Sequence, residues 1–260
     1  MVSLVLHQFR FDVKRFWRDP ASLFFSLAFP LIFLLVFSTL IGSSDETAEI
    51  RGRTFQAKTY FVPGIMAIGI VSTTFVNLSI SITASRERGL LKRIQATPLS
   101  MGVLIAARVT ISVTMALLVV LLTMAVSALF YGVDLPGTPL VGLFLALVIG
   151  SAAFCSLAFA LTTVIPNAAA ASAAANMLVL PLSFISGVFV RNDNIPRGAQ
   201  AIADLLPVRH LFTALLMPYH PNTSGAGVQW QDLGILGAWG LLGLIVALRF
   251  FRWVPFGEGG

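Results

Sequence analysis

The stretch RERGLLKRIQATP, residues 86–98, separates two long apolar runs and holds four of the 17 Lys and Arg residues of the chain. Its apolar residues Leu90, Leu91 and Ile94 recur at helical spacing, while the charged residues fall elsewhere around the same turns. Pro98 ends the pattern, because a proline cannot continue a helix. The stretch therefore predicts a short amphipathic helix with a face available for another molecule.

The composition is that of a membrane protein. Hydrophobic residues make up 57% of the 260 residues and charged residues 11%, whereas soluble domains carry about 25% charged residues. The charges are also segregated, since none occurs between Val109 and Val133 or between Leu135 and Val190. The net charge of +6 does not indicate a nucleic-acid partner, because the basic residues lie at the ends of apolar runs, where membrane topology explains them.

Six apolar stretches are long enough to cross a bilayer, which takes about 20 residues of helix. They predict spans at residues 22–42, 61–84, 103–131, 140–165, 170–190 and 233–248. The first is not a signal peptide, because its apolar run is too long and no small-residue cleavage site follows it. Lys and Arg concentrate before the first span, in the stretch 86–98 and after the last span. We therefore expect a multi-pass protein of the cell (inner or plasma) membrane with both termini in the cytoplasm.

Residues 1–20 predict an amphipathic helix that lies in the membrane interface. Phe9, Val13 and their neighbours form an apolar face, and Arg10 and Lys14 belong to a basic face that would meet anionic lipid head groups. This helix either anchors the chain to the membrane or, as a rigid elbow, packs beside the 85–98 helix and shares its partner. The two interpretations are compatible.

The predicted spans carry no Asp, Glu, Lys or His in their middle, and Arg108 and Asp134 stand near span ends. Ion-coupled carriers need ionisable groups at that depth to bind and release the ion. The sequence also has no G-x-x-x-x-G-K-[ST] phosphate loop, no H-E-x-x-H and no G-x-S-x-G. We expect that the chain is not an enzyme and that any energy for transport comes from outside it.

Candidate metal or redox residues are few. Cys155 lies in an apolar run and is the single cysteine, which excludes a disulfide framework and predicts a small buried side chain. His210 and His220 lie near Asp204 in the fifth connection, a set more typical of ordinary loop hydrogen bonding than of a metal site. We expect neither a metal nor a cofactor in this chain.

Uncharged polar residues mark the second and fifth spans and could line a translocation path. The candidates are Thr73, Asn77, Ser81, Asn176 and Ser183. For any single one of them, hydrogen bonding and close packing between helices is the favoured interpretation. A path without charge would suit hydrophobic or amphiphilic molecules, such as drugs, lipids or lipid-linked intermediates, better than ions.

The fifth connection, residues 191–231, is too apolar for a solvated loop and too interrupted for a span. It predicts two short helices that dip back into the outer leaflet and are divided at Pro207. They form either a small extracellular cap without moving parts or a gate over a central exit. The gate residues would be Phe184, Phe189, Leu206 and Pro207.

Three further stretches point to a family. They are Arg18-Asp19-Pro20, the run from Glu87-x-Gly89 to Thr97-Pro98-Leu99-Ser100, and the series Ser186-Gly187-Val188, Ile195-Pro196 and Leu206-Pro207. Together with six spans in this order, they resemble the permease subunit of ABC-2 type ATP-binding cassette transporters, which share the exporter fold (type V) of the ABCG-like transporters. The resemblance covers nearly the whole chain and implies an all-α membrane protein with one transmembrane domain over residues 1–260.

The resemblance also implies a coupling helix at residues 85–98 that docks on a separate ATPase subunit, where ATP and Mg would bind. Its contact or shaping residues would be Glu87, Gly89, Leu90, Arg93, Ile94 and Pro98. Two permease copies, or two related chains, would face each other around a central path and in contact with membrane lipids. The connection at residues 43–59 is short and polar, whereas many relatives have a larger outer domain.

Two other functions stay open at this point. A membrane anchor or scaffold would recruit a cytoplasmic partner without moving a substrate, and would not need polar faces on the second and fifth spans. A secondary carrier would transport its substrate without any nucleotide.

Overall fold

The computed structural model describes residues 47–50, 52–91, 101–188, 197–223 and 225–251, together with Ile32. Within these residues, five helices are long and apolar enough to cross a membrane. The predicted interfacial helix at residues 1–20 and the first predicted span at residues 22–42, apart from Ile32, lie outside the described residues. The count of six spans therefore stays a prediction.

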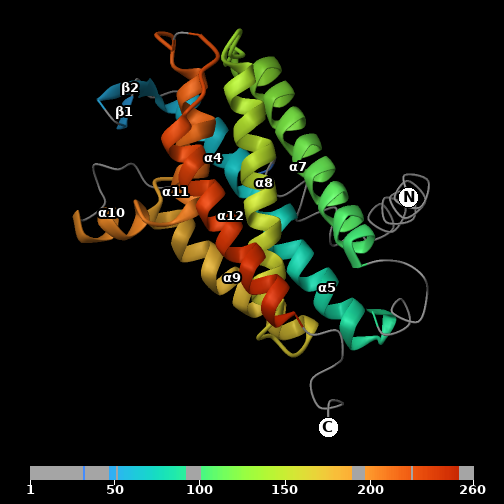
Figure 1. Cartoon of the computed structure of the whole chain (residues 1–260). Helices are drawn as coiled ribbons and strands as arrows, with labels where there is room; N and C mark the ends of the chain where they lie inside the picture. Colours follow the sequence, from blue (N-terminus) through green and yellow to red (C-terminus); the bar gives the residue numbers. More distant parts are fainter. Residues whose placement is uncertain are drawn as a thin grey trace.

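The five long helices form one bundle (Figure 1). They are the continuous helix α4 (Ala57–Val71), η2 (Ser72–Val76) and α5 (Asn77–Glu87), then α7 (Met101–Tyr131), α8 (Leu140–Thr162), α9 (Ala168–Ile185) and α12 (Trp230–Phe250). The second to sixth predicted spans are confirmed as apolar helices of spanning length, with their ends displaced by a few residues. We call the end of the bundle where α5 stops the Arg86 end.

The second predicted span contains a π-helical turn in its middle. The backbone N–H of Asn77 donates to the carbonyl oxygen of Ser72, five residues earlier, and this wider turn rotates the following residues around the helix axis. As a result, the predicted polar face is not a straight stripe. Thr73 is buried, whereas Asn77 and Ser81 are half-buried.

Helix α8 lies at the centre of the packing and contacts α4, α5, α7, α11 and α12. Small residues allow its backbone to approach α12 closely. A Cβ atom built on Gly240 would lie 3.1 Å from the Cα of Ala153, and one built on Gly243 would lie 2.8 Å from the backbone nitrogen of Leu157. This close approach through glycine is typical of helix pairs in membranes.

The expectation of an all-α chain is wrong for the connection before α4. Strands β1 (Thr47–Ile50) and β2 (Arg53–Gln56) form an antiparallel hairpin in which Ile50 pairs with Arg53. Gly52 in the two-residue turn has a φ of 69°, which glycine adopts without strain. Ile50 and Phe55 are buried, so alternating apolar residues and the turn glycine stabilise strands in a segment that reads as polar. We call the end of the bundle beside this hairpin the hairpin end.

The connection between α9 and α12 contains two short helices, α10 (Arg197–Ala203) and α11 (Pro207–Leu216), and a 3-10 turn, η4 (Met217–Tyr219). Pro207 is the first residue of α11, where its missing N–H costs nothing. Helix α11 packs against α4, α8 and α12, whereas α10 contacts α9 and lies at the side of the bundle (Figure 1). The depth of both helices in a bilayer stays a prediction.

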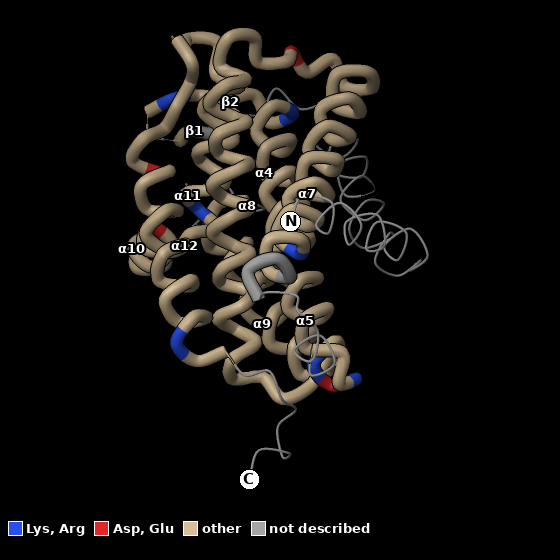
Figure 2. Tube along the Cα trace, turned by 45° about the vertical axis from the view of Figure 1, so that its right-hand side comes forward, with Lys and Arg blue, Asp and Glu red and all other residues tan. Residues whose placement is uncertain are grey.

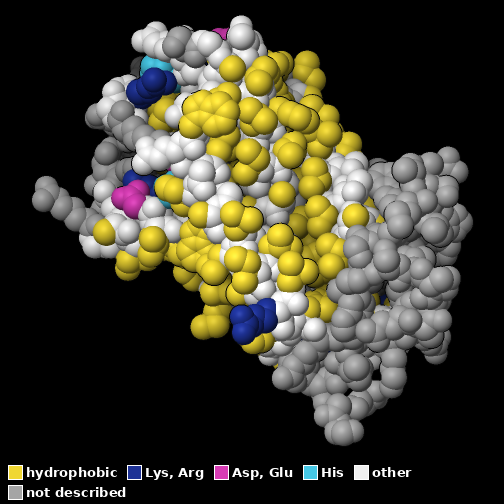
Figure 3. Space-filling model, viewed as in Figure 1, with side chains coloured by type: hydrophobic (Ala, Val, Ile, Leu, Met, Phe, Trp, Pro, Cys, Tyr) yellow, Lys and Arg dark blue, Asp and Glu magenta, His cyan; other side chains and the backbone are white. Residues whose placement is uncertain are grey.

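The surface of the described chain matches a lipid environment. Lys, Arg, Asp and Glu lie near the two ends and along one side of the bundle, with long uncharged stretches between them (Figure 2). Figure 3 shows a broad hydrophobic face over α7, α8 and α12. Large apolar side chains such as Leu129, Leu241 and Leu248 are exposed on these helices. This pattern indicates a multi-pass membrane protein.

Candidate functional site

Arg86 ends the long membrane helix and is fully buried. Its Nη1 donates to the backbone oxygen of Thr162, the last residue of α8, at 2.7 Å, and its Nη2 donates to the backbone oxygen of Ile165. A cation at the C-terminus of a helix satisfies carbonyls that have no intrahelical partner and interacts favourably with the helix dipole. Arg86 therefore caps α8.

Glu87 makes the matching contact to the next helix. Its Oε2 accepts a hydrogen bond of 3.2 Å from the backbone N–H of Ala168, the first residue of α9. A carboxylate at a helix N-terminus is favoured by the dipole, and the side chain of Asn167 accepts a second bond from the N–H of Ala170. Two adjacent residues of α5 thus bind both helix ends at the α8–α9 junction, residues 163–167.

The candidate coupling residues fall partly in the described chain. Gly89 has a φ of 66°, and its N–H donates to the backbone oxygen of Arg86 at 3.0 Å, which turns the chain out of α5. Leu90 is exposed, whereas Leu91 is buried. Three further candidates lie outside the described residues, and they are Arg93, Ile94 and Pro98.

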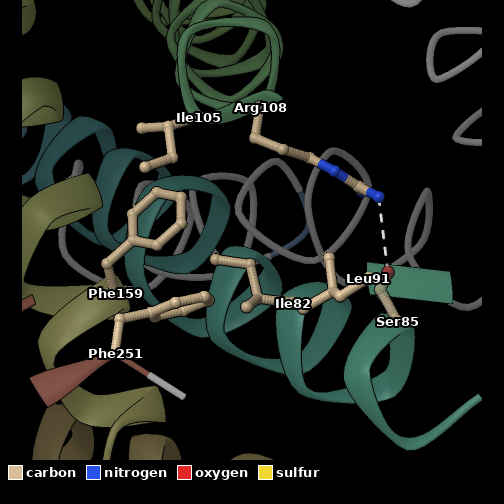
Figure 4. A pocket seen from close by; sticks show the side chains of 7 residues that line it. All are labelled: Ile82, Ser85, Leu91, Ile105, Arg108, Phe159 and Phe251. Atoms are coloured by element: carbon tan, nitrogen blue, oxygen red, sulfur yellow. Dashed lines mark hydrogen bonds between the residues drawn. The ribbon is translucent and has the colours of Figure 1, made fainter. Parts of the chain in front are cut away.

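Arg108 of α7 is also engaged in hydrogen bonds. Its Nη1 donates to Oγ of Ser81 at 2.8 Å and its Nη2 donates to Oγ of Ser85 at 3.3 Å, so it joins α7 to α5. Figure 4 shows Arg108 and Ser85 beside a small cavity of about 10 Å³, close to the space that one water needs. Its lining comes from four segments and consists of Ile82, Ser85, Leu91, Ile105, Arg108, Phe159 and Phe251. Ser81 is therefore part of a helix–helix contact.

Two of the candidate path residues are buried and bonded within their own helices. The hydroxyl of Thr73 donates to the backbone oxygen of Gly69 at 2.9 Å, and that of Ser183 donates to the backbone oxygen of Val179 at 2.8 Å. Asn176 is exposed, and its side-chain nitrogen donates to the backbone oxygen of Ser172. The structure thus brings the candidate residues to neighbouring helices, since α5 packs against α9, but it does not place them on one common face.

Helix α9 has a narrow buried stripe and a wide exposed face. Its buried residues Ala171, Ala175, Val179 and Ser183 follow each other at a spacing of four. The exposed face combines the polar Asn176 with large apolar side chains, and those are Met177, Leu178, Leu180 and Phe184. Asn176 is therefore a polar side chain on an otherwise largely apolar exposed face.

The candidate gate residues lie near the end of α9 and the start of α11. Phe184 is exposed, Leu206 is half-buried and Pro207 is buried, whereas Phe189 lies outside the described residues. The end of α9 is held against α4, because the hydroxyl of Tyr60 donates to the backbone oxygen of Gly187. The structure places these residues on adjacent elements, and their role as a gate stays a prediction.

A buried acid–base pair escaped the sequence analysis. In His210 of α11, Nδ1 lies 2.7 Å from Oδ1 of Asp232, and Nε2 lies 2.8 Å from the backbone oxygen of Asp204. A carbonyl oxygen only accepts, so Nε2 carries a hydrogen and donates. Asp232 is fully buried in the first turn of α12, just before the predicted start of the sixth span. The position of Asp232 directly before a predicted span was the signal in the sequence that could have indicated this pair.

The side chains of the other two candidate metal-site residues have different partners. The ring of His220 packs edge-on against Phe55 at 5.1 Å, and the side chain of Asp204 forms an ion pair of 2.9 Å with Arg209. No group of three His, Cys, Asp or Glu residues that could hold a metal occurs among the described residues. Cys155 is buried, as predicted.

A larger hollow of about 610 Å³ lies between α7, α8 and α12 in the described part of the chain. Its lining is apolar apart from Ser156, whose hydroxyl lies within hydrogen-bond distance of the backbone oxygens of Ala153 and Gly240. Gly237 also lines it, and a Cβ atom there would meet nothing within 4 Å. The hollow suits hydrocarbon.

Comparison with known proteins agrees with this arrangement. Residues 5–219 match the family described as ABC-2 type transporter. The chain is also similar to the daunorubicin resistance ABC transporter permease protein DrrB1 of Streptomyces coeruleorubidus, with 28% identity over 239 residues that cover 90% of this chain and 80% of the relative. The family match spans most of the chain, including the α5 end, the α8–α9 junction and α11. The chain belongs to the ABC-2 type transporter family.

Proposed function

We propose that the chain is the membrane-spanning subunit of an ATP-driven exporter that moves a hydrophobic or amphiphilic molecule, such as a drug, a lipid or a lipid-linked intermediate. The observation that carries the proposal is the engagement of Arg86 and Arg108 in hydrogen bonds between helices. No Asp, Glu, Lys or His lies in the middle of the spans that the structure describes. An ion-coupled mechanism needs such a group at depth, so the driving energy comes from another subunit.

The motor in this proposal is a separate ATPase subunit that binds ATP and Mg and docks on residues 85–98. Permease subunits of this family are membrane components without an ATPase site of their own. The exposed Leu90 beside the turn at Gly89 supports the docking site, because an apolar side chain at the Arg86 end is available for a partner. Arg93, Ile94 and Pro98 complete the proposed contact, and Glu87 shapes it from within the permease through its hydrogen bond to Ala168.

In this proposal the chain lies in the inner or plasma membrane of the cell. The distribution of Lys and Arg supports an orientation in which the Arg86 end and both termini face the cytoplasm. In that orientation the β1–β2 hairpin and α10–α11 lie on the outer side. Phe184, Phe189, Leu206 and Pro207 would then gate the exit.

The exposed face of α9 supports an assembly of two permease chains. Met177 is 79% exposed and Phe184 is 51% exposed on the same helix as Asn176. In the proposal, this face meets a second copy or a related chain across the path, and Asn77, Ser81 and Asn176 provide polar contacts along it. Thr73 and Ser183 support the path from within their helices. Membrane lipids cover the remaining apolar surface.

Reconstitution tests the proposal. The chain would be co-expressed with a candidate ABC ATPase subunit from the same organism, purified as a complex and inserted into lipid vesicles. Daunorubicin, the compound in the name of the similar permease, is the first probe. We expect ATP-dependent, vanadate-sensitive movement of the probe, or of a labelled phospholipid, that is absent without the ATPase.

A linker variant separates transport from anchoring. Replacing residues 89–98 by a flexible linker leaves Arg86 and Glu87 in place and should abolish stimulation of ATP hydrolysis by the permease. A complex that binds the ATPase but moves neither probe would favour a membrane anchor. Movement of the probe without nucleotide would favour a secondary carrier and overturn the proposal.

A further inference from the structure

The last two residues of α5 contact two different helix ends. Arg86 donates to the backbone oxygens of Thr162, the last residue of α8, and of Ile165 in the junction, and Glu87 accepts from the first N–H of α9. Consecutive residues on an α-helix point about 100° apart, so one helix end can reach two neighbours in this way. Both contacts connect segments that are far apart in the chain, since residues 86 and 162 are separated by 76 positions.

Helix α9 packs mainly against α5, and this connection fixes its first turn. Its buried stripe consists of four residues at one spacing, and its remaining residues are half-buried or exposed. The N-terminal end of α9 is therefore held by Asn167, Glu87 and the short junction to α8. A shift of α5 at Arg86 would move both helix ends at the junction together, because Arg86 is fully buried and bonded to backbone atoms.

We propose that Arg86 and Glu87 form a clamp that holds the α8–α9 junction and moves it with the end of α5 during transport. Both are positioning residues, which act on the path through α9. The inference rests on the proposed function, because a docked ATPase supplies the movement. It gives Glu87 an internal partner, the N–H of Ala168, in place of a contact on the ATPase.

The hydrogen bond between Glu87 and Ala168 can be removed from either side. Glu87→Ala removes the acceptor. Ala168→Pro removes the N–H donor at the first position of α9, where proline is well tolerated and where the preceding Asn167 is already extended, with φ −141° and ψ 167°. Arg86 is left unchanged, because substitution of a fully buried cation risks unfolding.

Two neighbouring substitutions serve as matched controls. Arg88→Gln removes an exposed charge one residue after the clamp, and Ala169→Pro introduces proline at an exposed position in the same first turn of α9. The readouts in the reconstituted complex are probe moved per ATP hydrolysed and hydrogen exchange of the backbone amides in residues 163–171.

We expect Glu87→Ala and Ala168→Pro to lower the probe moved per ATP by roughly three- to tenfold, as loss of a hydrogen bond of ordinary strength would do. Binding of the ATPase and ATP hydrolysis should be retained. The double variant should move no less probe per ATP than the single variant with the larger defect, because both substitutions remove the same hydrogen bond. Exchange in residues 163–171 should increase in both single variants and stay at the parent level in both controls.

The clamp is overturned if Ala168→Pro keeps the parent ratio of transport to hydrolysis while Glu87→Ala lowers it, because Glu87 would then act on the ATPase. It is also overturned if exchange at the junction is the same in all variants. A parent complex that neither binds an ATPase nor moves substrate refutes the proposed function instead. In that case the exchange data alone decide whether the clamp exists.

Discussion

At the scale of single residues, the buried polar groups of this chain serve to connect helices. Arg86 and Arg108 use their guanidinium groups for backbone and hydroxyl oxygens of other segments. His210 and Asp232 connect α11 to the first turn of α12 in the same manner. Such groups are costly to leave without partners inside a membrane protein, so each contact contributes to the stability of the bundle.

The pair of His210 and Asp232 allows a matched comparison of two aspartates. Asp232→Ala leaves a buried imidazole without its acid partner and should lower the free energy of unfolding by about 2–4 kcal/mol. Asp204→Ala removes an exposed carboxylate paired with Arg209 and should cost less than about 1 kcal/mol. Thermal unfolding in detergent micelles measures both, and equal losses would contradict a structural role of the buried pair.

The contact between His220 and the β1–β2 hairpin should depend on pH. Burial, together with the nearby positive charge of Arg53, lowers the pKa of His220 below its ordinary value of about 6.5. Because the folded chain then favours the neutral imidazole, this contribution to stability is present above that pH and is lost as pH falls through the folded pKa. The melting temperature should fall between pH 7.5 and pH 5.5, by more in the parent chain than in His220→Gln. An equal fall of the melting temperature in the parent chain and in His220→Gln would show that His220 does not contribute to the pH dependence.

At the scale of secondary-structure elements, the position of α12 is determined by close contact with α8. Gly243 lies against the backbone of Ser156 and Leu157, and a Cβ atom there would approach these backbone atoms within 2.9 Å. Gly237 lies on the same helix at the hollow and meets nothing within 4 Å. The two glycines therefore have opposite structural requirements.

Alanine at these two glycines should produce effects of opposite sign. Gly243→Ala forces α12 away from α8 and should lower the free energy of unfolding by about 1–3 kcal/mol. Gly237→Ala adds no clash and removes the helix-weakening effect of glycine, which should raise stability by about 0.5–1 kcal/mol. Thermal unfolding of both variants in the same detergent is the measurement. A stabilising Gly243→Ala would contradict the close contact.

Elements were predicted well where a pattern was long and poorly where it was short. The second to sixth apolar runs correspond to helices, since hydropathy over about 20 residues is a strong local signal. The β1–β2 hairpin was missed because four-residue strands in a polar segment carry little periodicity. The π-helical turn at Ser72–Val76 was also missed, and it displaced the predicted face of Thr73, Asn77 and Ser81.

At the scale of the whole molecule, the described chain leaves α9 exposed while α4 and α8 are well covered. Of the spanning windows of α9 and α12, 22% is buried in each, against 72% for the helix that contains α4 and α5, and α9 is distinguished from α12 by the exposed Asn176 in its middle. A helix with a polar residue on such a face is expected to meet another chain. This asymmetry is the basis for expecting a dimer.

Cross-linking tests the dimer directly, because Cys155 is the single cysteine and is buried. In a Cys155→Ala background, Met177→Cys on the exposed face of α9 should give an oxidised dimer in native membranes. Leu248→Cys, which is 71% exposed on α12, is the matched control and should remain monomeric. Equal cross-linking at both positions would contradict an α9 interface.

The amino-acid sequence by itself determined the class of protein, the described spans and the lack of Asp, Glu, Lys and His in their middle. These properties follow from hydropathy and composition, which act locally along the chain. Only the tertiary structure decided which polar residues meet. Glu87 was predicted as a contact or shaping residue of the coupling helix, and the structure gives it a partner in Ala168, 81 residues away, while Asp232 pairs with His210. Helix ends satisfy their free backbone groups with whatever side chain folding brings there, and short-range patterns carry no information on that choice.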